Sequence, residues 1–310
     1  MTTIYLSHPE CLNHDPGGGY PESPDRLMKI TARLKDPEFD ALIRKPAPKA
    51  DLAQLARVHE IQYVQKTLAS ITKSTIVKVD ADTRLSPQSK DALLRAAGST
   101  CAAVDSIMAG EAHNAFCAVR PPGHHASSDK SMGFCFFNNI AVGAAHARAV
   151  HGLERVAIMD FDVHHGNGTQ NIFRADPTVF FASTHQWMLF PKTGAAGEVG
   201  VGNVLNIPLP NGTKGDHFRR VFADQVVPAL DKFAPQMMFI SAGFDAHIAD
   251  NVSGLKLVDG DFNWATRELM AVAARHAESR VVSVLEGGYN TRALAASVAS
   301  HVRTLMETSE

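Results

Sequence analysis

Short runs of apolar residues recur along the chain, and each is bounded by turn residues. They are "AFCAV" at 115–119, "VAIM" at 156–159, "VFFAS" at 179–183, "MMFIS" at 237–241 and "VVSVL" at 281–285. The runs are continuous, whereas a strand with one face in water alternates between apolar and polar residues. They therefore predict strands that are covered on both faces.

Helical patterns of apolar residues lie between these runs. Ser86 and Pro87 predict an N-cap and a first helical residue, apolar side chains then recur on one face as far as Met108, and Gly110 predicts the end. Further helices are predicted at 140–147, ending near Gly152, and at 269–276 and 294–305. Buried strands that alternate with amphipathic helices predict an α/β fold, in which one parallel sheet is sandwiched between helix layers.

No internal repeat, low-complexity tract or linker divides this pattern. The glycine-rich segments "DPGGGYPESP" and "TGAAGEVGVG" are short enough to be loops. At 310 residues, of which 45% are hydrophobic, the chain can bury a large core. We expect residues 1–310 to form a single domain.

Charge and composition exclude several kinds of partner. Charged residues make up 20% of the chain and nearly cancel, to a formal net charge of -2, so no basic field attracts nucleic acid or an anionic membrane. The start "MTTIYLSHPE" lacks the pattern of a secretory signal, and no apolar run approaches the roughly 18 residues of a membrane span. We expect a cytoplasmic protein, and an oligomer is compatible with the sequence.

The cysteines give no evidence of a disulfide framework. Cys11, Cys101, Cys117 and Cys135 are scattered and lack CxxC spacing. This pattern indicates reduced, mostly buried thiols, and it does not fit a thiolate zinc site.

Polar residues with potential chemistry follow several of the predicted strands. "RPPGHHA", "DFDVHHGNG", "AGFDAH" and "EGGYN" come after the runs that end at 119, 159, 241 and 285. In parallel sheets the ligand crevice lies outside the carboxyl ends of the strands. Asp162 and His164 project to the same side of an extended segment, and Asp245 from another strand can complete a three-ligand set. This ligand set is typical of catalytic zinc and would also accept iron(II) or manganese.

Each of these motifs also has a purely structural interpretation. An isolated D-x-H is most often a capped loop end, the tandem His124 and His125 can be a satisfied loop pair, and Tyr289 can be a packing residue. The coincidence of several such strand ends favours a functional site. Histidines that stand singly in helical segments are expected to be structural or surface residues, at positions 59, 146, 276 and 301.

In this order, "RPPGHHA", "GFCFFNN", "DFDVHHGNGTQ", "SAGFDAH" and "EGGYN" resemble the motifs of the zinc-dependent histone deacetylase family. The resemblance runs from near His8 to the final helix. "YPESPDRL" at 20–27 and "HHGNGTQ" resemble the class II branch and its bacterial relatives, the deacetylase-like amidohydrolases. It implies the arginase/deacetylase fold, with a single parallel sheet of about eight strands.

The resemblance also implies roles for the motif residues. Asp162, His164 and Asp245 would bind zinc, with Fe2+ as an alternative, and a structural potassium ion would be bound by Asp160, Asp162, His164, Ser183 and Thr184. The implied substrate tunnel is lined by Gly133, Phe134, Phe190 and, at its mouth, Val252. His165 is expected to have a structural role, because its side chain should alternate away from that of His164.

His124 and His125 would be the catalytic pair, and Tyr289 would donate to the oxyanion. Asp160 would orient His124, and Asn167 stands behind His125, where class I members carry an aspartate. Because an amide does not stabilise an imidazolium as a carboxylate does, His125 should be the less basic histidine.

The implied activity is removal of acetyl or other short acyl groups from N-acyl-lysine side chains or small acetylated amines, by attack of metal-activated water. An acetylpolyamine amidohydrolase is an alternative, although it calls for an acidic residue where this chain has Val252. An arginase-like dimanganese enzyme needs carboxylates at Gly166 and His247. A non-catalytic acyl-lysine binding protein is a further alternative, which the presence of Tyr289 disfavours. The physiological substrate is left open.

Overall fold

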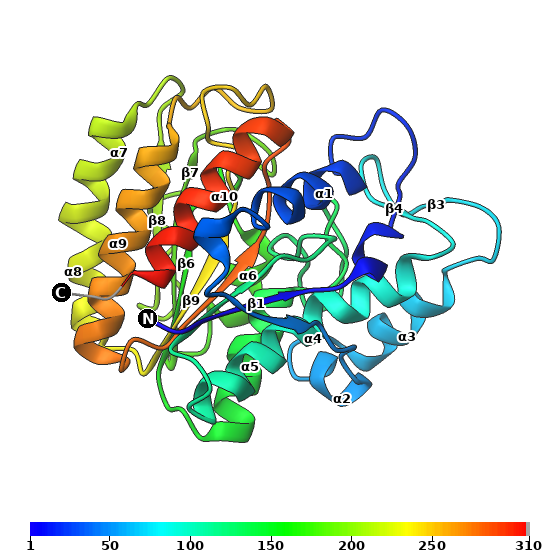
Figure 1. Ribbon diagram of the computed structural model, residues 1–310, viewed down its shortest axis with the longest axis horizontal. Helices are drawn as coiled ribbons and strands as arrows, with labels where there is room; N and C mark the ends of the chain where they lie inside the picture. The colour runs from blue at the N-terminus through cyan, green and yellow to red at the C-terminus, as the bar shows by residue number, and fades with distance from the viewer. Residues whose placement is uncertain (308–310) are drawn as a thin grey trace.

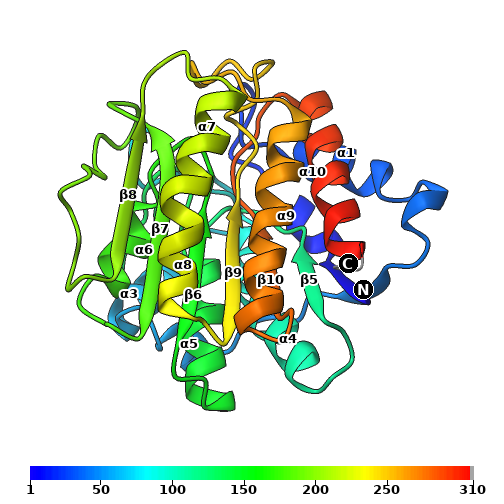
Figure 2. The same ribbon diagram turned by 90° about the vertical axis from the view of Figure 1, so that its left-hand side faces the viewer.

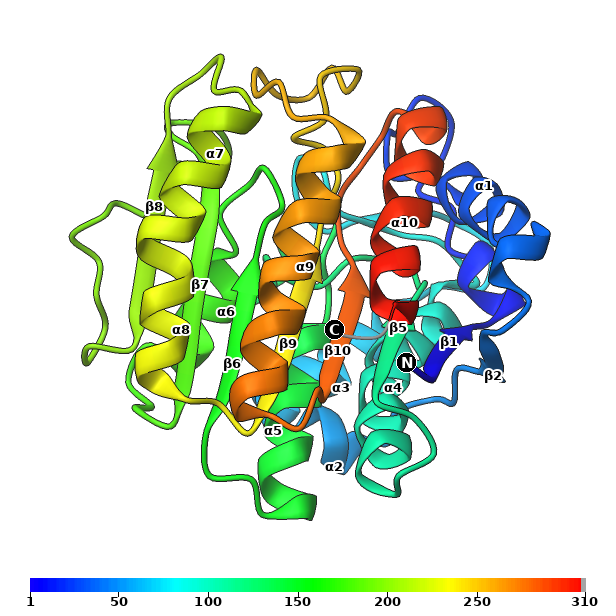
Figure 3. The same cartoon turned by 60° about the vertical axis from the view of Figure 1, so that its left-hand side comes forward.

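Eight strands form one sheet in the computed structural model, which describes residues 1–307. Every neighbouring pair in this sheet is parallel. Figure 3 shows the strands in the order β2-β1-β5-β10-β9-β6-β7-β8. Their bounds are β1 Thr3–Ser7, β2 Ile43–Pro46, β5 Asn114–Cys117, β6 Val156–Asp160, β7 Val179–Gln186, β8 Val204–Leu209, β9 Met237–Ala242 and β10 Val281–Leu285. A separate antiparallel pair is formed by β3 Val77–Lys78 and β4 Arg84–Leu85.

Helices cover both faces of the sheet. Figures 1 and 2 show α7–α10 on one face and α2–α6 on the other, while α1 packs against α10. The helix bounds are α1 Pro24–Arg33, α2 Leu52–Leu55, α3 Ile61–Ala69, α4 Ser89–Met108, α5 Asn139–His151, α6 Asn167–Phe173, α7 Gly215–Val221, α8 Val227–Phe233, α9 Asp259–His276 and α10 Thr291–Met306. The predicted layered α/β fold is confirmed.

The predicted strands are β5, β6, β7, β9 and β10, which occupy interior positions of the sheet and are buried along almost their whole length. The sequence patterns did not reveal β1, β2 and β8. Both β2 and β8 are edge strands, and β2 is mostly exposed. Edge strands bury less side-chain surface, so their sequences lack a continuous apolar run.

The predicted helices are α4, α5, α9 and α10, and the predicted end of α5 is confirmed by Gly152, which has a φ of 68°. The predicted start of α4 is wrong. The helix begins at Ser89, with Gln88 as its N-cap. Ser86 Oγ accepts a hydrogen bond from Asp15 N at 3.1 Å, so this hydroxyl ties two loops together.

The strand order brings the chemistry-bearing segments together. The strands that they follow, β5, β10, β9 and β6, are consecutive in the sheet. Because these strands are parallel, their carboxyl ends meet at one edge, at the top of Figure 3.

Two composition-based expectations can be compared with the structure. All four cysteines are buried and unpaired, as predicted. Across residues 1–307, no helix combines the length and the apolar character that crossing a bilayer requires.

Candidate active site

Asp162, His164 and Asp245 meet at the carboxyl edge of the sheet. One potential ligand atom from each lies within 4.8 Å of the others. In each carboxylate one oxygen accepts a hydrogen bond from a backbone N–H of another segment, and the other oxygen faces His164. Asp162 Oδ2 accepts a hydrogen bond from Gly287 N at 2.8 Å, and Asp245 Oδ1 accepts one from Val163 N at 2.9 Å. The other oxygens face His164 Nδ1, Asp162 Oδ1 at 3.0 Å and Asp245 Oδ2 at 3.2 Å.

These residues fit a divalent cation. Asp245 Oδ2 is buried and receives no well-aligned hydrogen bond, although His164 Nδ1 is 3.2 Å away. Burial lowers the pKa of the His164 imidazole, but hydrogen bonds and charges from Asp162 and Asp245 outweigh burial and raise this pKa to about 10. The group therefore favours positive charge at its centre, which a metal ion with carboxylate and imidazole ligands would supply.

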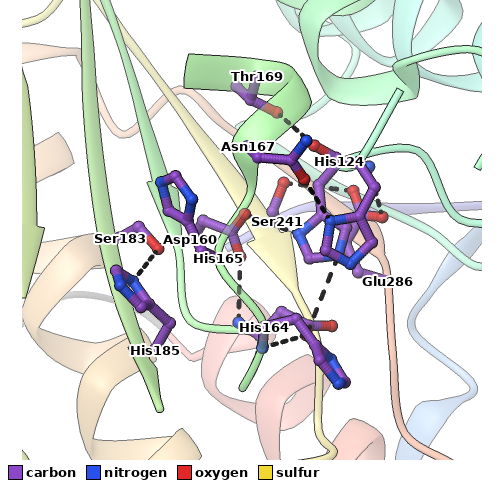
Figure 4. A network of polar contacts seen from close by, with 12 residues as sticks. His124, Asp160, His164, His165, Asn167, Thr169, Ser183, His185, Ser241 and Glu286 are labelled. Atoms are coloured by element: carbon purple, nitrogen blue, oxygen red, sulfur yellow. Dashed lines mark hydrogen bonds and ion pairs between the residues drawn. The ribbon is translucent and has the colours of Figure 1, made fainter. Parts of the chain in front are cut away.

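His124 and His125 follow β5, and each ring is held at Nδ1. His124 Nδ1 lies 2.9 Å from Asp160 Oδ2, and His125 Nδ1 lies 2.7 Å from Asn167 Oδ1. The two ring centroids are 4.0 Å apart. Figure 4 shows His124 and Asn167 on the opposite side of Asp160 from His185. The structure thus brings together the pairs that the family resemblance implied.

The two histidines differ in basicity because their neighbours differ. Burial lowers the pKa of His124, but the negative charges of Asp160, Asp162 and Glu286 outweigh burial and raise it to about 10. Burial and the nearby positive charge of His124 lower the pKa of His125 well below its ordinary value. The expectation that His125 is the less basic histidine is confirmed.

Tyr289 reaches the site from the segment after β10. A Cβ atom at Gly287 would lie 2.1 Å from Asp245 Oδ2, so only glycine lets this backbone pass so close to the carboxylates. Arg26 Nε donates to Gly288 O at 2.6 Å, and the guanidinium lies 5.0 Å from the Tyr289 ring centroid. Burial raises the pKa of Tyr289 well above 10, so its hydroxyl remains a donor.

A cavity of about 200 Å³ opens onto these groups. Its lining includes the predicted tunnel residues Gly133, Phe134, Phe190 and Val252 together with His125, His164 and Tyr289, and it also includes Pro21 and Asp82. The Phe190 ring stands nearly perpendicular to that of His125, with centroids 5.1 Å apart. Gly133 has a φ of 54°, and a Cβ atom there would lie 2.4 Å from His125 Cδ2. A side chain at this position would therefore displace the histidine.

Sequence reasoning missed two carboxylates. Glu286 is fully buried, and its Oε2 accepts hydrogen bonds from Gly123 N at 2.7 Å and His124 N at 3.2 Å. Its Oε1 accepts one from Ser241 Oγ at 3.2 Å. The acid stands directly after a buried strand in "EGGYN", which was an available signal. Asp82, in a loop remote from every predicted strand, carried no such signal.

The residues implied for potassium lie at the carboxyl ends of β6 and β7 and in the segment that follows β6. Asp160 and Ser183 are partners in the register of β6 and β7, and Thr184 follows. Ser183 Oγ lies 3.0 Å from His185 Nδ1, whereas Thr184 Oγ1 is buried without a hydrogen-bond partner. His165 bonds Thr193 Oγ1 at 2.8 Å and Gln170 Oε1 at 2.9 Å, which confirms its predicted structural role.

The histidines that stand singly are held by hydrogen bonds outside this site. His301 lies between Thr266 Oγ1 and Ser283 Oγ, and His59 receives a hydrogen bond from Asn138 N. His276 Nε2 lies 2.9 Å from Asp231 Oδ1. The structural interpretation of these residues is confirmed.

His146 belongs to a second group of ligand-type residues, with Asp105 and His151. Arg57 Nη1 donates to His146 Nδ1 at 2.9 Å, so the proton of that ring is on Nε2, which donates to Asp105 Oδ1 at 2.7 Å. Because these atoms are already paired and Arg57 adds positive charge, this group serves as a hydrogen-bond network.

Comparisons with known proteins agree with this geometry. The model of the histone deacetylase domain matches residues 20–305. Type-2 histone deacetylase 2 of Dictyostelium discoideum is 35% identical over 98% of this chain, which spans 21% of that protein. Histone deacetylase 10, chloroplastic, of Oryza sativa subsp. japonica is 38% identical over 98% of this chain and 72% of its own length. The histone deacetylase-like amidohydrolase of Pseudomonas aeruginosa is 38% identical over 88% of this chain and 73% of its own length.

A solved structure has the same architecture. The HDA15 HD domain superposes with a TM-score of 0.93 at 32% sequence identity, covering 98% of this chain and 88% of that one. The all-parallel eight-stranded sheet is therefore that of the arginase/deacetylase fold. The fold and the domain match show that this chain belongs to the histone deacetylase family, hydrolases that act on amides.

Proposed function

We propose that the chain is a metal-dependent deacetylase that removes acetyl or other short acyl groups from N-acyl-lysine side chains or related small acetylated amines. The observation that carries this proposal is that His125, His164 and Tyr289 face one narrow cavity. A proton acceptor, a metal ligand and a hydroxyl donor are thus directed at the same small volume, as amide hydrolysis requires. The products would be a carboxylate, such as acetate, and a free amine.

Asp162, His164 and Asp245 would hold the metal, which we propose to be zinc, with Fe2+ as the alternative. When bound, the metal would polarise the amide carbonyl and lower the pKa of a water molecule. Asp245 Oδ2, one of the two carboxylate oxygens that face His164, receives no backbone hydrogen bond, which supports its role as a ligand.

His125 would act as the general base and then as the general acid. Its low pKa keeps the imidazole neutral, and it lines the cavity, so it can accept a proton from the attacking water. The same proton can then pass to the leaving amine, which leaves poorly unless it is protonated. Asn167 holds Nδ1, and so directs Nε2 to the substrate. His124, held protonated beside Asp160, would stabilise the negative charge that develops.

The Tyr289 hydroxyl would donate a hydrogen bond to the oxyanion that forms on the amide carbonyl. Loss of one such donor costs about 100-fold in kcat or more. The walls formed by Phe134 and Phe190 would bind the aliphatic part of the substrate and exclude bulk water. A lysine side chain fits this description, because it presents its acyl amide at the end of an unbranched alkyl chain.

An acetylpolyamine amidohydrolase remains the second candidate, because of Asp82. Val252 supplies an apolar wall, which favours a neutral chain. Asp82 lines the same cavity and contributes a carboxylate, which would attract a cationic amine. The two residues thus favour different substrates.

We also propose a structural potassium ion bound by Asp160, Asp162, His164, Ser183 and Thr184. Two observations support it: Asp160 and Ser183 are register partners, and Thr184 Oγ1 is buried without a partner. The cation would satisfy that oxygen and hold the segment from which the catalytic side chains project.

A turnover panel with metal analysis of the same sample tests the proposed activity. We expect an acetyl-lysine peptide to be hydrolysed with a higher kcat/KM than N-acetylputrescine, and a chelator to stop the reaction. Tyr289→Phe should lose about 100-fold in kcat. A preference for N-acetylputrescine would establish the polyamine alternative. Failure of the metal-loaded protein to hydrolyse any of these amides, or turnover of arginine or agmatine, would overturn the proposal.

A further inference from the structure

A carboxylate from a neighbouring loop holds the backbone of Tyr289. Asp250 lies in the loop between β9 and α9, and it is 6% exposed. Its Oδ2 accepts hydrogen bonds from Tyr289 N at 2.6 Å and Asn290 N at 3.0 Å. Its Oδ1 accepts one from Val252 N at 3.3 Å. One side chain therefore contacts both the segment of the hydroxyl donor and a residue that lines the cavity.

The same two segments are joined at a second point. Asn290 Nδ2 donates to Ala249 O at 2.9 Å, while Asn290 Oδ1 accepts from Ala293 N at 3.1 Å and caps α10. Within residues 1–307, no lysine, arginine or histidine forms an ion pair with Asp250. Its charge is compensated by backbone N–H groups and by the N-terminus of α10. The side chain therefore fixes backbone positions and does not neutralise a cation.

The remainder of this loop is anchored away from its tip. Ile248 N donates to Leu257 O at 2.8 Å, and Gly254 N donates to Gln186 Oε1 at 2.7 Å. These bonds hold the two ends of the loop, which is drawn in orange at the top of Figure 3. At the tip, Asp250 and Ala249 make the contacts with the Tyr289 segment. Removal of the Asp250 carboxylate would therefore leave the tip attached to the Tyr289 segment only through Asn290 Nδ2 and Ala249 O, with the ends of the loop still held.

We propose that Asp250 is a positioning residue that links the cavity mouth at Val252 to the backbone of Tyr289. This inference rests on the proposed function, in which the Tyr289 hydroxyl donates to the oxyanion. Such a donor works only within about 2.7–3.1 Å of its acceptor, so a shift of the Tyr289 backbone costs rate. Val252 N donates to the same carboxylate. A substrate that displaces Val252 at the cavity mouth therefore also changes the position of the Tyr289 hydroxyl.

Two substitutions distinguish the hydrogen bonds to the Tyr289 segment from the hydrogen bond to Val252 N. Asp250→Ala removes all of these bonds, and kcat should fall by about 10-fold or more. In Asp250→Asn the amide oxygen can still accept from Tyr289 and Asn290, while the amide NH2 cannot accept from Val252 N. The asparagine variant should keep kcat within about 3-fold and raise KM instead. Asn251→Ala, at an exposed neighbouring position, is the matched control and should change neither constant.

A double-mutant comparison tests whether Asp250 acts through the tyrosine. In a Tyr289→Phe background, Asp250→Ala should lower kcat by less than about 2-fold, because the hydroxyl that it positions is already gone. An equal loss in both backgrounds would contradict the proposal, and so would an unchanged kcat in the single Asp250→Ala variant.

Amide hydrogen exchange tests the link without any activity. In Asp250→Ala, exchange should rise at 249–252 and at 289–290 together, whereas Asn251→Ala should leave 289–290 protected. Unchanged exchange at 289–290 would overturn the link even in an active enzyme. A rise there in a protein without amidase activity would support the link and count against the proposed function alone. If the alanine variant does not fold, Asp250→Asn provides the test. Its amide exchange should rise at residue 252 only, and protection at 252 equal to that of the wild type would refute the link.

Discussion

At the scale of single residues, identical side chains are given different chemistry by one neighbouring atom. His124 and His125 are adjacent, their rings are 4.0 Å apart, and both are buried. A carboxylate holds Nδ1 of the first, and an amide oxygen holds Nδ1 of the second. The charge of Asp160 favours the protonated form of His124, whereas Asn167 fixes the direction of the His125 ring without adding charge.

Asn167→Asp should therefore shift the pH profile of the enzyme. A carboxylate 2.7 Å from His125 Nδ1 would raise the pKa of that imidazole by about one unit or more. Because the base works only in its neutral form, the acid limb of the kcat/KM profile should move to higher pH. The profile of Asn171→Asp, which adds the same charge at an exposed position of α6, is the control. Identical acid limbs in the wild type and Asn167→Asp would show that His125 is not the base.

At the scale of elements, the strands that could be predicted from the sequence are those that are buried on both faces. The interior strands other than β1 could be predicted because both faces are covered, which forces a continuous apolar run. The edge strand β2, with "IRKP", has no such constraint. In the site, motif residues at strand ends could be placed together because strand direction is predictable. Asp82 and the side-chain direction of Glu286 could not be, because they depend on how loops pack.

In one loop a single side chain makes the hydrogen bonds to backbone carbonyls that a helix or a strand would otherwise provide. The turn between α6 and β7 is held by Asn203, whose Nδ2 lies 2.8 Å from the carbonyl oxygens of Phe173, Asp176 and Val179. Asn203→Ala would remove the amide donor from all three carbonyls, although those of Phe173 and Asp176 keep a backbone N–H donor. The loss should cost about 1–3 kcal/mol in the free energy of unfolding. Urea denaturation measures the change, with the exposed Asn211→Ala as control. A loss below about 0.5 kcal/mol would show that water replaces the amide.

At the scale of the whole molecule, buried neutral histidines set the response to acid. Burial lowers the pKa of each of them from 6.5, to about 4 for His14, His59 and His165, and to about 3 for His185 and His301. Below pH 6.5 the unfolded chain binds protons that the folded chain does not, so stability falls as the pH falls toward 4. Each histidine contributes at most about 1.4 kcal/mol per pH unit in this window.

Urea midpoints measured across this window test the prediction, which is a steady loss of stability below pH 6.5. Carboxyl groups whose pKa is raised by burial act in the opposite direction, and they include Asp82 and Asp160 as well as Glu286 and Asp245. Burial raises the pKa of Glu286 to about 7 and that of Asp245 to about 6, so protonation of these groups favours the folded state, but they are outnumbered by the histidines. His301→Gln should flatten the slope, and a midpoint that does not depend on pH in this window would contradict the account.

The order β5-β10-β9-β6 has a practical consequence. The tandem histidines and two of the proposed ligands precede the exposed residue Gly197, whereas Asp245 and Tyr289 follow it. A chain divided at that point would give two fragments, neither of which holds a complete set of reactive groups. The fragments would regain hydrolysis only by interleaving, because β10 and β9 of the second fragment must enter between β5 and β6 of the first. This enzyme is thus a natural starting point for a split reporter, in which acetate release records the reunion of its halves.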